Sequence, residues 1–156
     1  MTLAALEVAI EPGAAIVIDS SVILAYLEGS EAISELAATV FDRLVAPARN
    51  AAVIPAISVT EVLVRPFRAG SPSAAGTIEA FLRRFPNLSI MPVSYEIARE
   101  AATIRAVTAL RTPDATILAT ATITRSPVVV TNDGRWQAAI ERARLPIRLC
   151  RLDAFL

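Results

Sequence analysis

Five short apolar runs recur along this chain, and segments with helical periodicity separate them. The runs lie at residues 14–18, 51–56, 88–93, 127–131 and 146–152. Several of them are apolar throughout, which is typical of strands in a parallel sheet that helices cover on both faces. The alternation of strands and helices therefore predicts an α/β fold around a parallel sheet, with right-handed crossovers.

The segments between the runs place apolar residues three and four positions apart, as on one side of a helix. Ile97, Ala101 and Ile104, for example, share one face of the segment 94–110. Helices are predicted at residues 20–28, 31–46, 58–69, 74–85, 94–110, 113–124 and 135–143. Pro66 lies inside one of them and should kink or end it, because proline cannot donate the backbone hydrogen bond that a helix needs.

A chain of 156 residues with 54% hydrophobic and 19% charged residues fits one compact domain. We expect a loosely attached leader at residues 1–13 and a single domain at residues 14–156. The leader has no basic residue and carries Glu7 and Glu11, so it does not resemble a signal peptide. No charge-free run approaches the ~20 residues that cross a bilayer. We therefore expect a cytoplasmic protein that does not enter a membrane.

Two residue types are missing from the sequence, and their absence excludes several kinds of chemistry. The chain has no histidine, so it has no imidazole general base and no histidine-held metal. All fifteen basic residues are arginines, and the lack of lysine excludes P-loop, Schiff-base and protein-kinase chemistry. The single cysteine, Cys150, lies in a predicted strand and is expected to be a packed thiol. Carboxylates, hydroxyls, amides and arginines remain for polar catalysis.

Four acidic residues lie where predicted strands end or helices begin. Asp19 follows the run 14–18 directly, and Asp133 follows the run 127–131. Glu61 comes early in the helix after the run 51–56, and Asp114 lies in the first turn of the helix at 113–124. Ligands bind beyond the carboxyl ends of the strands in such folds, so these acids are candidates for one shared site.

Each of these acids also has a structural explanation. Glu61 could close a capping box with Ser58 or pair with Arg65 one turn later. Asp114 could favour the positive end of its helix dipole, and Asp133 could form a turn with the glycine that follows it. Asp19 could cap the end of its strand. These explanations remain open for each residue taken alone.

The joint interpretation is that a cation holds the four acids together, since converging carboxylates would otherwise repel one another. Oxygen ligands without histidine suit Mg²⁺ or Mn²⁺. Such an ion neutralises phosphate oxygens and activates a water molecule as the nucleophile. Three further residues, Ser21, Thr131 and Asn132, could hydrogen-bond the carboxylates or the waters of the metal, although capping a helix or a turn is the simpler role for each.

With these residues in place, the chain resembles the PIN-domain family, and among its members the VapC-type ribonuclease toxins of toxin–antitoxin pairs. Four segments carry the resemblance, in this order: "VIDSSVILAYLEG" with Asp19, "ISVTEVLVRP" with Glu61, "LRTPDATILATA" with Asp114 and "VVVTNDGRW" with Asp133. They run through residues 16 to about 152. One departure is that relatives often have "DAIHLATA" where this chain reads "DATILATA".

The resemblance implies a three-layer, Rossmann-like α/β/α domain with a central parallel sheet of four or five strands. It also implies cleavage of RNA that depends on Mg²⁺ or Mn²⁺, a homodimer, and inhibition by a small antitoxin protein. The family's acidic quartet matches Asp19, Glu61, Asp114 and Asp133. Thr131 matches the hydroxyl that commonly precedes the last acid by two residues.

Two other functions remain open from the sequence. A PIN-domain nuclease could act in RNA processing outside toxin–antitoxin systems, and an adjacent gene for a DNA-binding antitoxin would favour the toxin. A non-catalytic α/β binding or signalling module is the other alternative. A receiver domain would need a lysine, which this chain lacks, and a haloacid-dehalogenase phosphatase would need Asp-x-Asp where this chain has Asp19, Ser20 and Ser21.

Overall fold

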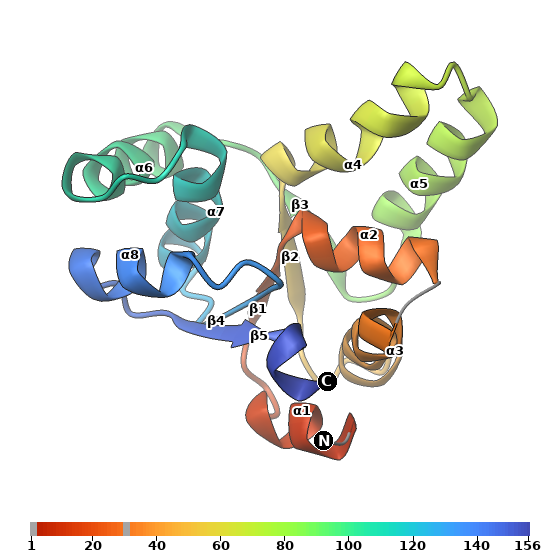
Figure 1. Cartoon of the computed structure of the whole chain (residues 1–156), viewed down its shortest axis with the longest axis horizontal. Helices are drawn as coiled ribbons and strands as arrows, with labels where there is room; N and C mark the ends of the chain where they lie inside the picture. The colour runs from red at the N-terminus through yellow and green to blue at the C-terminus, as the bar shows by residue number, and fades with distance from the viewer. Residues whose placement is uncertain (1–2, 30–31) are drawn as a thin grey trace.

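A five-stranded sheet, with all strands parallel, runs through the middle of the molecule (Figure 1). This computed structural model describes residues 3–29 and 32–156. The strands are β1 (Ile16–Ile18), β2 (Ala52–Pro55), β3 (Leu88–Met91), β4 (Val128–Thr131) and β5 (Arg148–Arg151). Their order in the sheet is β3-β2-β1-β4-β5. Each predicted apolar run thus contains one strand, and the parallel sheet is confirmed.

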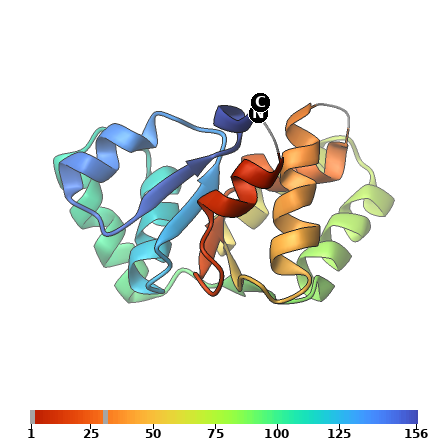
Figure 2. The same ribbon diagram turned by 90° about the horizontal axis from the view of Figure 1, so that it is seen from below.

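Helices cover both faces of this sheet, which makes three layers (Figures 1 and 2). Their bounds are α1 (Leu3–Ala9), α2 (Ser20–Glu28), α3 (Ala32–Ala38), α4 (Ala56–Arg68), α5 (Pro72–Arg84), α6 (Tyr95–Val107), α7 (Thr112–Ile123) and α8 (Trp136–Ala143). Helix α3 continues into a π-helical segment at Thr39–Val45, and a short 3₁₀ turn covers Leu152–Phe155. None of the helices in the described ranges combines the length and the apolar character that a membrane span requires.

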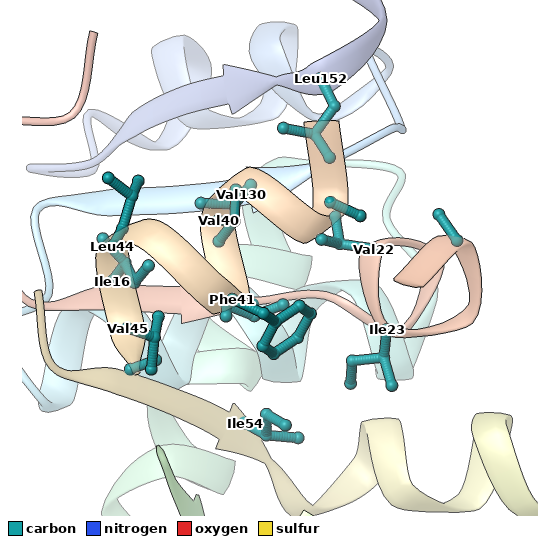
Figure 3. Packing of buried hydrophobic residues seen from close by; sticks show 14 of the residues in the cluster. Ile16, Val22, Ile23, Val40, Phe41, Leu44, Val45, Ile54, Val130 and Leu152 are labelled. Carbon is teal, nitrogen blue, oxygen red and sulfur yellow. The ribbon is translucent and has the colours of Figure 1, made fainter. Parts of the chain in front are cut away.

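Successive residues of the strands point to opposite faces of the sheet and so divide the core in two. In β1, Ile16 and Ile18 pack with helices α1 to α3, whereas Val17 packs with α6, α7 and α8. Figure 3 shows the first of these clusters, with Phe41 between the sheet and helix α2. Because both faces of the central strands are buried, they read as continuous apolar runs in the sequence. Cys150 is buried in the first cluster, and this burial raises its pKa to about 11, as expected for a packed thiol.

The strand order places a topological switch point between β1 and β4. The chain winds from β1 to β2 and β3 on one side, and then returns to β4 and β5 on the other side of β1. Residue Ile18 of β1 lies opposite Val130 of β4. In open α/β sheets the crevice at such a point, beyond the carboxyl ends of the strands, is where ligands bind. Asp19 and Asp133 follow these two strand ends.

Helix α4 differs from its prediction at both ends. It begins two residues earlier, at Ala56, and it passes through Pro66 to end at Arg68. Pro66 is buried in the last turn, and its missing N–H removes only the bond to the carbonyl oxygen of Val62. Ala69 still donates to the carbonyl oxygen of Arg65, so the helix continues past the proline. Helix α5 then starts at Pro72, because Ser71 caps it by accepting a hydrogen bond from the backbone N–H of Ala74.

The described part of the leader packs against the domain, which differs from the loose attachment expected from the sequence. Leu6 and Ile10 are fully buried in the core. Arg49 donates hydrogen bonds to the carbonyl oxygens of Glu7 and Ile10, at 2.8 and 2.9 Å. The side chain of Asn50 donates to the carbonyl oxygen of Glu11 at 2.7 Å. The leader is held because its two apolar residues lie one helical turn apart, and because polar side chains satisfy its last carbonyl groups.

Truncating the buried leucine of the leader tests this packing. We expect Leu6→Ala to lower the free energy of unfolding by about 2–5 kcal/mol, because it leaves a cavity in the core. Val8→Ala, on the same helix, is a matched control because Val8 is 81% exposed, and it should change stability by less than about 0.5 kcal/mol. Urea unfolding followed by circular dichroism measures both. Equal stabilities of the two variants would contradict the packing of α1 in the core.

Candidate active site

Asp19 lies where strand β1 ends and helix α2 begins. Its backbone N–H donates to the carbonyl oxygen of Val130 at 3.0 Å, which continues the pairing of β1 with β4. Its carboxylate caps α2 by accepting the backbone N–H of Ser20 at Oδ1, at 2.8 Å. Only 5% of the residue is exposed. The strand and the helix therefore fix both the backbone and the side chain of this acid.

The second carboxylate oxygen of Asp19 ties the ends of β1 and β4 together. Oδ2 accepts hydrogen bonds from Ser21 Oγ at 2.7 Å and from Thr131 Oγ1 at 2.9 Å. The two hydroxyl oxygens in turn accept the backbone N–H groups of Asn132 and Asp133, at 3.1 and 3.0 Å. Ser21 and Thr131 thus contact the acid that they were predicted to support. Asn132 joins through its backbone, and its buried side-chain Oδ1 has no partner among the described residues.

Glu61 joins this network through a residue that the sequence analysis did not select. Ser20 Oγ donates to Glu61 Oε2 at 2.5 Å, and it lies 3.3 Å from Asp19 Oδ1. The capping box does not form, because Ser58 is the third residue of α4 and its buried Oγ has no partner in the described parts of the chain. The pairing with Arg65 does not form either, since that guanidinium pairs with Glu28 of α2.

Asp114 lies in the first turn of α7 and is 8% exposed. Its Oδ2 accepts a hydrogen bond from Nε of Arg111 at 3.2 Å. The helix buries eight residues in a row, from Asp114 to Ala121. The inward placement of this acid, which its apolar neighbours at positions 117, 118 and 121 predict, is therefore observed.

Asp133 pairs with Arg135 two residues later. The backbone N–H of Arg135 donates to Oδ1 at 2.9 Å, and its Nη2 lies 2.5 Å from Oδ2. The hydrogen bond from this guanidinium is the main reason that the pKa of Asp133 lies below its ordinary value, and the nearby charge of Arg111 lowers this pKa further. The charge of Asp114 raises the pKa of Arg135 in turn. The two acid–arginine pairs are therefore close enough to interact.

Hydrogen bonds thus connect three of the acids, and electrostatic interaction relates the fourth, Asp114, to them. The path leads from Glu61 through Ser20 to Asp19, then through Thr131 to Asp133, whose arginine interacts with Asp114. The carboxylates themselves are not grouped. Among residues 3–29 and 32–156, no three acidic, histidine or cysteine side chains are placed to hold a metal ion together. Two of the acids instead point their oxygens at arginines.

The donors nevertheless suit a hard divalent cation. Asp19 is a buried carboxylate whose hydrogen-bond partners among the described residues are one backbone N–H and three hydroxyl groups, all neutral. A buried charge without an opposite charge is costly, and a cation would remove that cost. The neighbouring groups are carboxylate and amide oxygens, which Mg²⁺ and Mn²⁺ prefer. Asp19 would be the central ligand of such an ion.

Comparison with known families identifies the family of this domain. The family model named PIN domain matches residues 16–142, which include all four acids. This chain belongs to the PIN domain family. A comparison with curated proteins found no match.

Solved structures of similar fold include complexes and toxins of toxin–antitoxin systems. FitAcB from Neisseria gonorrhoeae is 20% identical, with a TM-score of 0.66 over 88% of this chain and 97% of that chain. VapC20 from Mycobacterium tuberculosis, described as a toxin that cleaves the sarcin-ricin loop, is 19% identical, with a TM-score of 0.63 over 80% and 94%. A toxin–antitoxin complex from Klebsiella pneumoniae is 20% identical, with a TM-score of 0.60 over 78% and 90%. At these identities the likeness establishes the shared fold.

Three residues of this PIN domain site escaped the sequence analysis. Ser20 bridges two acids, and Arg111 and Arg135 neutralise the other two. The spacing of Arg111 and Asp114, three residues apart at a helix start, is a signal that could have found one of them. The contact of Ser20 with Glu61 joins residues 41 positions apart, so no local pattern predicts it.

The tie between the strand ends can be tested at Thr131, which is fully buried. We expect Thr131→Val to lower the free energy of unfolding by about 1–3 kcal/mol, because Asp19 Oδ2 and the N–H of Asp133 both lose a partner. Thr131→Ser keeps the hydroxyl and loses one methyl group, so it should cost only about 1 kcal/mol. Chemical denaturation of the two variants gives the comparison. A valine variant as stable as the unmodified protein would show that the hydrogen bonds of Thr131 contribute nothing.

Proposed function

We propose that this PIN domain is an endoribonuclease that uses Mg²⁺ or Mn²⁺, and that it is the toxin of a toxin–antitoxin pair. The observation that carries the proposal is the position of Asp19. It is a buried carboxylate at the switch point of the sheet, with neutral hydrogen-bond partners and hydrogen bonds that lead to Glu61 and Asp133. A buried acid with no cation beside it is uncommon among structural acids, which supports a metal-binding role in addition to the capping of α2.

The proposed ligands are Asp19, Glu61, Asp114 and Asp133. A bound divalent cation would supply charge for the phosphate oxygens and would lower the pKa of a water nucleophile. Ser21 and Thr131 keep Oδ2 of Asp19 in a fixed orientation, and Ser20 holds Glu61 beside Oδ1. The residues thus orient the acids before substrate arrives, which is the main contribution that a protein makes to catalysis of this kind.

RNA is proposed as the substrate and an antitoxin as the partner, and the descriptions of the fold neighbours support both. One of them is a toxin that cleaves the sarcin-ricin loop, and others are toxin–antitoxin complexes. A homodimer is proposed on a separate observation. Val64 and Phe67 of α4 are large apolar residues that are exposed, and they line an apolar cavity of about 640 Å³ together with Val59 and Leu63. A second copy of the chain would cover this surface.

Cleavage of total RNA by the purified protein tests the proposed activity. We expect cleavage with Mn²⁺ or Mg²⁺ and none with EDTA. Asp19→Asn and Asp114→Asn should each lower the cleavage rate by more than about 100-fold, because each removes a charged metal ligand. Circular dichroism should show that both variants stay folded.

A matched control exists at Asp42, an exposed acid on the π-helical segment that accepts a hydrogen bond from Tyr26. Asp42→Asn should cleave RNA at the rate of the unmodified protein, because the asparagine oxygen can still accept that bond. An Asp19 or Asp114 variant with full nuclease activity would overturn the four-acid site.

A further inference from the structure

A cavity of about 680 Å³ opens beside the acids, among the end of α6, the start of α7 and helix α8. Asp114 forms part of its wall, so the cavity begins at the proposed metal site. Cavities of this size hold small ligands, and a single nucleotide is within the range. The proposed metal site accounts for Asp114 but not for the other residues that line this cavity.

Positive charge dominates this lining. Arg111, Arg135 and Arg142 contribute to the wall, against the single carboxylate of Asp114. Arg111 and Arg135 are paired with Asp114 and Asp133, as described above. The side chain of Arg142 makes no hydrogen bond or ion pair with any residue in the described ranges. Its planar guanidinium is therefore free to bind a phosphate with two parallel hydrogen bonds.

A buried donor in the same wall lacks an acceptor. Trp136, the first residue of α8, is 2% exposed and lines the cavity. Its indole N–H is buried and has no partner in the described parts of the chain. Buried polar groups in native proteins are nearly always hydrogen-bonded, so this unpaired donor beside the cavity is one that a water or a ligand atom would satisfy. Val107 and Leu110 add apolar surface to the same cavity.

We propose that this cavity is a subsite for one nucleotide of the RNA, next to the nucleotide that is cleaved. Arg142 binds its phosphate, and the indole N–H of Trp136 donates to an oxygen or nitrogen acceptor of the same nucleotide. The apolar residues contact its ribose or base. This subsite rests on the proposed nuclease function, because the RNA bound at the acids would enter the cavity at Asp114.

RNA binding by an Arg142 variant tests the subsite. The probe is a fluorescein-labelled 12-nucleotide RNA of mixed sequence, and fluorescence anisotropy follows its binding. The buffer contains Ca²⁺ in place of Mg²⁺ so that the RNA is not cleaved. We expect Arg142→Gln to raise the Kd about 5- to 10-fold at low salt. The slope of log K against log salt should fall in magnitude by about 0.7, since one phosphate contact is lost. A gel confirms that the RNA stays intact.

Arg99→Gln is the matched control, because Arg99 is an exposed arginine of α6 outside the cavity lining. It removes the same charge and should leave both the Kd and the salt slope unchanged. Trp136→Phe keeps an aromatic ring and removes the N–H. It should weaken binding about 3- to 10-fold with the salt slope preserved, because the lost hydrogen bond involves no counterion. The melting temperature of Trp136→Phe shows whether this variant folds. If it does not fold, Arg142→Gln still tests the subsite, because Arg142 is exposed.

The outcomes separate this inference from the proposed function. If the unmodified protein cleaves RNA and Arg142→Gln binds RNA as tightly and with the same salt slope, the subsite is wrong and the nuclease stands. Equal weakening by Arg99→Gln would also overturn the subsite, since net charge alone would explain it. If the unmodified protein neither binds nor cleaves RNA, the proposed function fails and the subsite fails with it.

Discussion

The hydrogen bonds of the Asp19 carboxylate are the interaction on which the rest of the site depends. One oxygen caps helix α2, and the other accepts hydrogen bonds from the hydroxyl groups of Ser21, in the first turn of α2, and Thr131, at the end of β4. These hydroxyls also accept the backbone N–H groups that lead to Asp133. The sheet switches its winding direction between the same two strands. A single carboxylate therefore holds the start of α2 and the segment before Asp133 in place at the carboxyl ends of β1 and β4.

Arginine provides the opposing charge around this buried acid. Asp114 and Asp133 have one arginine each, and each pair lies within electrostatic reach of the other. Because the chain has no lysine or histidine, guanidinium groups carry all of the positive side-chain charge. Guanidinium groups suit both carboxylates and phosphates. Under the proposed function, the arginines that neutralise the acids would also attract the anionic backbone of RNA to the cavity beside them.

The sequence predicts the strands well because its signals for them are local. A strand buried on both faces needs an uninterrupted apolar run, and each of the five runs contains a strand. The placement of acids beyond the ends of β1 and β4 follows from the same runs. The bridge from Ser20 to Glu61 could not be predicted, since it depends on how α4 approaches α2. The docking of the leader likewise depends on Arg49 and Asn50, which are about forty residues away along the chain.

Anomalous X-ray diffraction from crystals grown with Mn²⁺ tests the central claim most directly, because it locates the metal without relying on activity. The account predicts one strong anomalous peak at the carboxyl ends of β1 and β4, bound by an oxygen of Asp19 and by oxygens of Asp114, Asp133 or Glu61, with Arg111 or Arg135 turned away from its acid. A fully occupied Mn²⁺ elsewhere, with Asp19 bound only to its serine and threonine partners, would contradict it.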